Sequence, residues 1–130
     1  MGPAALPWTL TRRQGFRLAL AGCLIAITVL ALIPPGHEPV GSADKVNHFA
    51  AFLVLAWLAD HAYPGYSFRP EPWMALLGYG LLIEVLQAFL PYREASLGDL
   101  VADGAGLLAY LALRRTRLGR QRRSRARAQL

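Results

Sequence analysis

Residues 18–33, LALAGCLIAITVLALI, contain no charged side chain and end at Pro34-Pro35-Gly36. A helix on the surface of a soluble protein needs a polar face opposite its apolar stripe, and this segment has none. A helix that crosses a bilayer needs about 20 mostly apolar residues. The segment therefore predicts a membrane-spanning helix that is completed by its flanking residues.

Three further apolar segments follow, at residues 46–63, 73–90 and 100–113. Each contains only a few strongly polar residues, so none has the polar face of a soluble amphipathic helix. They are short for a span and reach across the bilayer only if polar flanking residues lie at the interface. We predict an all-α fold, a transmembrane bundle of four short helices, in preference to a soluble bundle.

Composition agrees with a membrane protein that has basic tails. The 130 residues allow one domain; 55% are hydrophobic and only 17% are charged, against about 25% charged in soluble domains. The predicted organisation is an N-terminal cytoplasmic tail over 1–14, a four-span membrane domain over 15–113 and an Arg-rich cytoplasmic tail over 114–130. The arginines of that last tail are Arg114, Arg115, Arg117, Arg120, Arg122, Arg123, Arg125 and Arg127.

The distribution of lysine and arginine predicts the orientation. Basic residues concentrate in the cytoplasmic loops of membrane proteins, and here they flank the first segment and fill the C-terminal tail. Only Lys45 and Arg93 lie in the loops at the other end, 34–45 and 91–99. We expect a multi-pass protein of a bacterial cytoplasmic membrane with both termini cytoplasmic. A cleaved secretory signal is disfavoured, because Pro34-Pro35 follows the first segment in place of a small-residue cleavage site.

The basic tail itself has two interpretations. A cluster of arginines directly after a span attracts anionic lipids. Nucleic-acid binding is the alternative, but residues 114–130 contain no aromatic side chain on which a base could stack. We expect anionic lipids, and no nucleic acid, to be the partner of the tail.

Polar residues converge on the outer ends of three predicted spans. Asp44 and His48 are four residues apart and share a helix face, and Glu84 and Gln87 are three apart. Asp99, Asp103 and Gly106 follow one stripe of the last span. An ionisable residue inside a membrane predicts a functional site. The candidate site residues are Asp44, Lys45, His48, Glu84, Gln87, Arg93, Ser96, Asp99, Asp103 and Gly106.

These residues resemble the VanZ-like family over roughly 15–113. The family pattern is an Asp-Lys pair followed by His, a Glu-x-x-Gln helix, and an Arg before an Asp-x-x-x-Asn-x-x-Gly helix. This sequence has Asp44-Lys45-Val46-Asn47-His48-Phe49, Glu84-Val85-Leu86-Gln87, and Arg93 and Ser96 before Asp99, Asp103 and Gly106. Asp103 stands where the family usually has Asn. The resemblance implies a multi-pass bacterial membrane protein linked to reduced sensitivity to the glycopeptide teicoplanin, with no defined reaction.

Several functions of the polar residues remain open. In a lipid-headgroup site, Lys45 and Arg93 would hold a phosphate while Glu84, His48 and Asp99 orient it or move a proton. In a purely structural bundle, the same residues would form ion pairs, with Glu84–Arg93 and Lys45–Asp99 expected to pair.

A metal site and a proton or ion pathway are weaker alternatives. His48, Glu84, Asp99 and Asp103 offer one imidazole and three carboxylates, without any closely spaced pair of ligands. Ser96 lacks the context of an activated nucleophile, so the sequence contains no recognisable catalytic constellation. This favours a protein that is not an enzyme but leaves open whether a reaction is catalysed, and we expect no cofactor. The ligand and the oligomeric state cannot be deduced from the sequence.

Overall fold

The computed structural model describes residues 10–36 and 42–129, and these residues form helices and no strand. The helices are α1 (Arg12–Leu32), α2 (Ser42–Ala62), α3 (Glu71–Ala88) and α4 (Leu97–Ala128), with a short 3-10 turn, η1 (Pro64–Tyr66), before α3. The predicted all-α fold with four helices is confirmed. Most of the predicted N-terminal tail and part of the 34–45 loop fall on 1–9 and 37–41, outside the described residues.

Local sequence accounts for the ends of α1. The side chain of Thr11 accepts a hydrogen bond from the Gln14 backbone N–H, and the Gln14 side chain accepts one from the Thr11 N–H. This reciprocal capping box satisfies two amides that the helix leaves unpaired. At the other end Pro34 cannot continue a helix, and α1 stops at Leu32.

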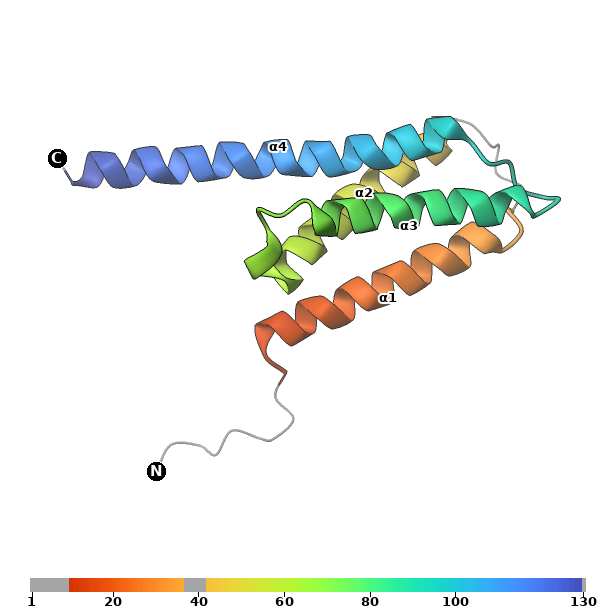
Figure 1. The fold of residues 1–130 in the computed structure, drawn as a ribbon, viewed down its shortest axis with the longest axis horizontal. Coiled ribbons are helices and arrows are strands. Elements are labelled where there is room, and N and C mark those ends of the chain that lie inside the picture. The colour runs from red at the N-terminus through yellow and green to blue at the C-terminus, as the bar shows by residue number, and fades with distance from the viewer. Residues whose placement is uncertain (1–9, 37–41, 130) are drawn as a thin grey trace, which may run out of the picture.

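The four helices form a bundle in which α2 is central. Figure 1 shows that α1 begins and α4 ends at one end of the bundle, whereas α1 and α3 end and α2 and α4 begin at the other. We call the latter the loop end. Helix α2 makes its most extensive contacts with α4 and then with α1. The first turns of α2 and α4 and the last turns of α1 and α3 therefore meet at the loop end.

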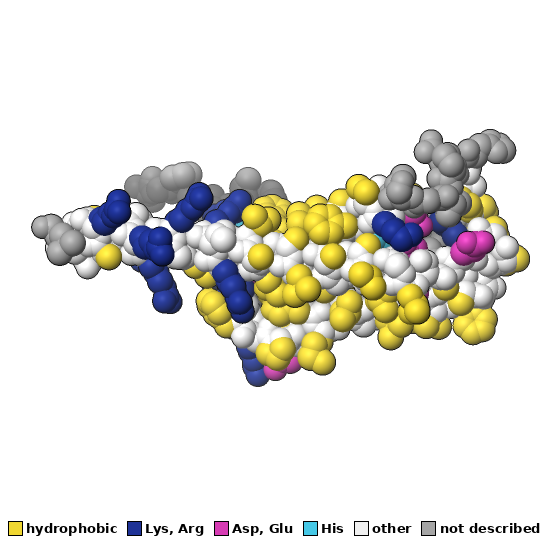
Figure 2. Space-filling model, turned by 90° about the horizontal axis from the view of Figure 1, so that it is seen from above, with side chains coloured by type: hydrophobic (Ala, Val, Ile, Leu, Met, Phe, Trp, Pro, Cys, Tyr) yellow, Lys and Arg dark blue, Asp and Glu magenta, His cyan; other side chains and the backbone are white. Residues whose placement is uncertain are grey.

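Few apolar side chains are buried, and many large ones are exposed. The buried apolar core is small and centres on Phe52, Leu55 and Ala56 of α2, and α1 has no buried residue at all. Leucines and other large apolar side chains remain exposed along all four helices. Hydrophobic side chains cover the middle of the face in Figure 2, and most basic ones lie along the projecting part of α4.

One helix in the described ranges, α1, is long and apolar enough to cross a membrane by length and composition. In α2, α3 and α4 the apolar run is interrupted by polar residues. Several of these, Glu84, Gln87, Asp99 and Asp103, are buried inside the bundle rather than exposed on its surface. The structure thus combines exposed apolar side chains with buried ionisable ones.

Helix α4 does not end with the last apolar segment. It continues as one helix from Leu113 through the arginine-rich segment to Ala128, and it projects beyond the other helices (Figure 1). The arginines of this extension, apart from the half-buried Arg114, are exposed. The predicted basic tail is therefore helical over almost all of its length.

Gly106 allows α2 and α4 to approach closely. A Cβ atom built on Gly106 would collide with the carbonyl oxygen of Phe49 and would lie 3.0 Å from the backbone nitrogen of Leu53. Because both are backbone atoms of α2, they cannot move aside as a flexible side chain would. Any residue other than glycine at position 106 forces the two helices apart.

We expect Gly106→Ala to lower the stability of the bundle by about 1–3 kcal/mol, the usual cost of overpacking. Gly78→Ala is the matched control, since a Cβ at Gly78 meets nothing within 4 Å. Thermal unfolding of the purified proteins in detergent measures both effects. Equal melting temperatures for the two variants would contradict the close approach at Gly106.

Candidate functional site

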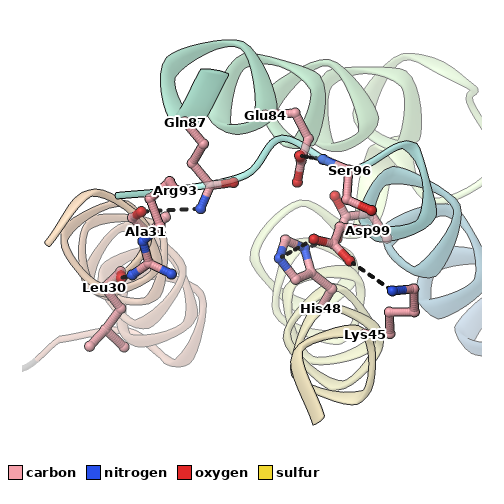
Figure 3. A network of polar contacts seen from close by, with 10 residues as sticks. Leu30, Ala31, Lys45, His48, Glu84, Gln87, Arg93, Ser96 and Asp99 are labelled. Atoms are coloured by element: carbon pink, nitrogen blue, oxygen red, sulfur yellow. Dashed lines mark hydrogen bonds and ion pairs between the residues drawn. The ribbon is translucent and has the colours of Figure 1, made fainter. Parts of the chain in front are cut away.

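Six ionisable residues from three helices lie together at the loop end, and we call them the polar cluster. Helix α2 supplies its members from the first two turns, α3 from its last turns and α4 from its first two turns. Figure 3 shows most of them around His48. The members of the polar cluster are Asp44, Lys45, His48, Glu84, Asp99 and Asp103.

The shortest contact in the cluster joins His48 to Asp103. The Nδ1 atom of His48 lies 2.8 Å from Oδ1 of Asp103, whose side chain is fully buried. Space for this carboxylate comes from Gly80 of α3, where a Cβ would collide with Oδ2 of Asp103. Three helices therefore cooperate to place one hydrogen-bonded pair of side chains.

Asp99 lies between Lys45 and His48. Its Oδ1 is 3.9 Å from Nζ of Lys45, and its Oδ2 is 3.9 Å from Nε2 of His48 (Figure 3). The predicted Lys45–Asp99 ion pair is confirmed. The Lys45 side chain is 54% exposed, so water screens this pair and its contribution to stability is small.

The predicted Glu84–Arg93 ion pair is wrong. Glu84 instead accepts a hydrogen bond of 2.8 Å from the backbone N–H of Ser96, the residue before α4. Arg93 donates from Nε and Nη2 to the carbonyl of Ile33, and from Nη2 to the carbonyl of Leu30. A helix leaves its last four carbonyls unpaired, and its C-terminus carries a partial negative charge. Arg93 therefore caps α1.

Gln87 and Tyr92 act in the same way as Arg93. The side-chain amide of Gln87 donates to the carbonyl of Ala31, and the hydroxyl of Tyr92 donates to the carbonyl of Leu32. The sequence marked Gln87 and Arg93 as site residues but gave Tyr92 no such role. The candidate residues thus divide into the polar cluster, the side chains of Gln87 and Arg93 that cap α1, and Ser96 and Gly106, which contribute a backbone amide and a close helix contact.

Three buried carboxylate oxygens have no hydrogen-bond partner among the described residues. They belong to Glu84 (Oε1), Asp99 (Oδ1) and Asp103 (Oδ2). A charge that is removed from water costs several kcal/mol unless it is paired or neutralised. The polar cluster contains four carboxylates but only Lys45 and His48 as basic groups, so it has an excess of acidic side chains.

A cavity of about 660 Å³ lies beside the polar cluster, between α1 and α2. Its apolar walls include Ile27, Leu30 and Ile83, and its polar groups are Asp44, Asn47, His48, Gln87, Arg93 and Asp103. This volume lies within the range of about 300–1,000 Å³ that is usual for small-molecule sites. The cavity can accept a molecule with an apolar part and a polar end.

The metal-ligand set expected from the sequence differs from the one that the structure gathers. The sequence suggested His48, Glu84, Asp99 and Asp103. Within the described residues, the group whose ligand atoms all lie within 4.8 Å of one another is Asp44, His48 and Asp99. Glu84 is held by Ser96 and Asp103 by His48, so neither belongs to this group.

At the opposite end of the bundle, Asp60 forms a fully paired site. Its Oδ2 accepts from the hydroxyl of Tyr110 at 2.6 Å and lies 3.3 Å from Nε of Arg114, and its Oδ1 accepts from the hydroxyl of Ser67. The guanidinium of Arg114 also stacks on Phe68, 4.5 Å from the ring centre. These partners of Asp60 could not be predicted from the sequence, because they lie in a loop and in a different helix.

Comparison with family models, with curated proteins and with solved structures gives no match. The resemblance to the VanZ-like family therefore rests on the order and spacing of the quoted residues alone.

The contacts predict which residues are energetically coupled. His48→Ala and Asp103→Asn should be non-additive by about 0.5–3 kcal/mol, because each change removes the same hydrogen bond. Glu84→Gln and Arg93→Gln should add to within about 0.5 kcal/mol, since these side chains have separate partners. Unfolding of single and double variants in detergent provides both cycles. Coupling between Glu84 and Arg93 that equals the coupling between His48 and Asp103 would contradict this assignment.

Proposed function

We propose that the protein is a multi-pass bacterial membrane protein in which all four helices cross the bilayer. The large apolar side chains exposed along every helix support this proposal, since water would not favour them. Helix α2 has 21 residues, which at 1.5 Å per residue is about 30 Å, the thickness of a hydrocarbon core. In α3 and in the first two turns of α4, the polar residues Glu84, Gln87, Asp99 and Asp103 are buried inside the bundle, away from its surface.

The charge distribution supports an orientation with the loop end outside the cell. Arg12, Arg13 and Arg17 lie at the start of α1, and the arginine-rich part of α4 lies at the same end of the bundle (Figure 1). Among the described residues, the lysine and arginine side chains at the loop end are those of Lys45 and Arg93. By the positive-inside rule both termini are cytoplasmic.

Reporter fusions test this topology. Alkaline phosphatase, which is active only outside the cytoplasm, should be active when fused after Ala95 and inactive when fused after Leu130. A cytoplasmic fluorescent reporter fused at the same two positions should give the opposite pattern. An active phosphatase after Leu130 would contradict four spans.

For its function, we propose that the protein binds the headgroup of a cell-envelope lipid in the outer leaflet. The observation that carries this proposal is the cavity beside the polar cluster, whose lining combines apolar side chains such as Ile27 and Ile83 with the ionisable groups Asp44, His48 and Arg93. A lipid likewise combines an apolar part with a polar headgroup. The resemblance to the VanZ-like family adds a context, since glycopeptides act at the cell envelope.

The geometry changes the expected roles of the two basic residues. Lys45 approaches Asp99, whereas Arg93 lies beside α1, so the two side chains do not converge on one phosphate (Figure 3). Arg93 uses Nε and Nη2 to cap α1, which leaves Nη1 without a partner among the described residues. We assign the phosphate to Arg93, and the remaining polar part of the headgroup to the opposite wall with Asp44 and His48.

A purely structural bundle is the second candidate, and Asp60 favours it. Its carboxylate is fully paired with Tyr110, Arg114 and Ser67, which is the arrangement expected where ion pairs only join helices. The polar cluster differs, because three of its buried oxygens lack a hydrogen-bond partner in the described part of the chain. We therefore assign the structural role to the Asp60 site and the binding role to the loop end.

Filling the cavity tests the binding role. Ala50 lines the cavity and is exposed, so Ala50→Trp should occupy it without disturbing the core. Native mass spectrometry in detergent with added phosphatidylglycerol should show binding that is about tenfold weaker, a loss of about 1.4 kcal/mol. Ala75→Trp, on an exposed part of α3 away from the cavity, is the control.

Diacylglycerol, which lacks the phosphate, should bind the wild-type protein more weakly than phosphatidylglycerol. In an expressing strain, Ala50→Trp should also alter teicoplanin sensitivity, whereas Ala75→Trp should not. Equal lipid binding by the wild type and both tryptophan variants would contradict the headgroup proposal.

A further inference from the structure

The orientation of His48 leaves one ring nitrogen facing two carboxylates. Its Nδ1 contacts Oδ1 of Asp103 at 2.8 Å, and because a carboxylate accepts, Nδ1 carries the hydrogen. The other nitrogen, Nε2, lies 3.9 Å from Oδ2 of Asp99, and the carboxylate of Asp44 belongs to the same group of ligand atoms. A histidine that binds a metal through one nitrogen commonly donates from the other to a carboxylate, as His48 does to Asp103.

The carboxylates around His48 are not balanced by the basic groups nearby. Asp44, Asp99 and Asp103 can carry three negative charges. Among the lysines and arginines of the described ranges, only Lys45 forms an ion pair with one of these carboxylates, with its Nζ 3.9 Å from Oδ1 of Asp99. The side chain of Asp99 is 5% exposed, and its Oδ1 has no hydrogen-bond partner there. At the opposite end of the bundle both oxygens of Asp60 have partners, so the imbalance belongs to the loop end.

We propose that Asp44, His48 and Asp99 bind a divalent cation, and that Asp103 positions His48 for this role. Two carboxylates and one imidazole are suited to Zn²⁺ or Mn²⁺, since imidazole favours the former and carboxylate the latter. Three protein ligands leave at least one coordination position for water or a ligand oxygen. The site combines residues from the start of α2 with one from the start of α4, so the cation also joins these two helices.

The spacing of the three ligands fits an ion after a small adjustment. Their ligand atoms lie within 4.8 Å of one another. Around Zn²⁺, with bonds of about 2.0–2.2 Å, neighbouring tetrahedral ligands are roughly 3.4 Å apart, so the side chains close by about 1 Å or slightly more. Asp44 is only half-buried in the first turn of α2, so its carboxylate can rotate to make that adjustment.

A cation here would deepen the proposed lipid function. Asp44 and His48 both line the cavity, so an ion on them borders the space assigned to the headgroup. It would add a positive charge to the wall opposite Arg93, and an oxygen of the remaining polar part of the headgroup could occupy its open position. The role of the ion in lipid binding rests on the proposed function, whereas binding of the ion itself does not.

Calorimetric titration tests the site without any lipid. The full-length protein in detergent, freed of metal with a chelator, is titrated separately with ZnCl₂, MnCl₂ and CaCl₂. We expect saturable binding of one Zn²⁺ or Mn²⁺, and an affinity at least about tenfold weaker in Asp44→Asn and in Asp99→Asn. Glu94→Gln is the matched control, since Glu94 is an exposed carboxylate of the same end and lies outside the group.

Two results would overturn the metal site. One is a wild-type protein that binds none of the three ions saturably. The other is wild-type affinity in both Asp44→Asn and Glu94→Gln, a comparison that remains decisive even if Asp99→Asn does not fold. His48 would then be an imidazolium that pairs with Asp99 and Asp103.

Repeating the lipid measurement with and without EDTA separates the two proposals. If phosphatidylglycerol binds equally well in EDTA, the headgroup proposal stands and the ion takes no part in lipid binding. If the protein binds metal saturably but binds no lipid, the metal site stands and the proposed lipid function is contradicted.

Discussion

The close contact between α2 and α4 at Gly106 is the constraint on which the loop end depends. Asp103 precedes Gly106 by three residues, so both lie on the same face of α4 and the separation at Gly106 sets the reach of Asp103 toward His48. Gly80 performs the corresponding task on α3, because it leaves the space that the Asp103 carboxylate fills. Two residues without side chains thus determine where the buried charges of the protein can lie.

The two ends of the bundle treat buried carboxylates in different ways. Asp60 has a hydroxyl or a guanidinium on each oxygen, and its partners come from the 63–70 connection and from α4. In the polar cluster, Glu84, Asp99 and Asp103 each retain one buried oxygen without a hydrogen-bond partner in the described part of the chain, and only that of Asp99 has an ion-pair partner, Lys45 at 3.9 Å. Buried polar groups of folded proteins are almost always hydrogen-bonded, so each exception requires an explanation. A bound ion or ligand is an explanation that accounts for several unpaired oxygens at one place.

The sequence predicted the helices well, because their signals are local. The apolar segments, the prolines after residue 33 and the i, i+4 spacing of Asp44 and His48 depend on neighbouring residues only. It also predicted that the candidate residues gather at one end, since alternating helix directions in a bundle require it. The pairing of Lys45 with Asp99 followed from that topology.

What the sequence could not provide was the partner of each side chain. Arg93 was expected to seek the opposite charge of Glu84, yet the unpaired carbonyls of α1 attract it instead. Unpaired carbonyls are present at the C-terminal end of every helix, and no sequence pattern indicates them. The same holds for Glu84, whose partner is a backbone amide, and for Asp44, whose proximity to Asp99 depends on how α2 and α4 cross.

The unbroken course of α4 connects the two faces of the proposed membrane mechanically. Its 32 residues make a helix of about 48 Å, longer than a hydrocarbon core is thick. The attraction of arginines to anionic headgroups falls off within about 8 Å at physiological salt, so the far arginines feel it only if the helix leans toward the surface. In the proposed orientation, the tilt of this helical extension would therefore depend on the anionic lipid content of the inner leaflet.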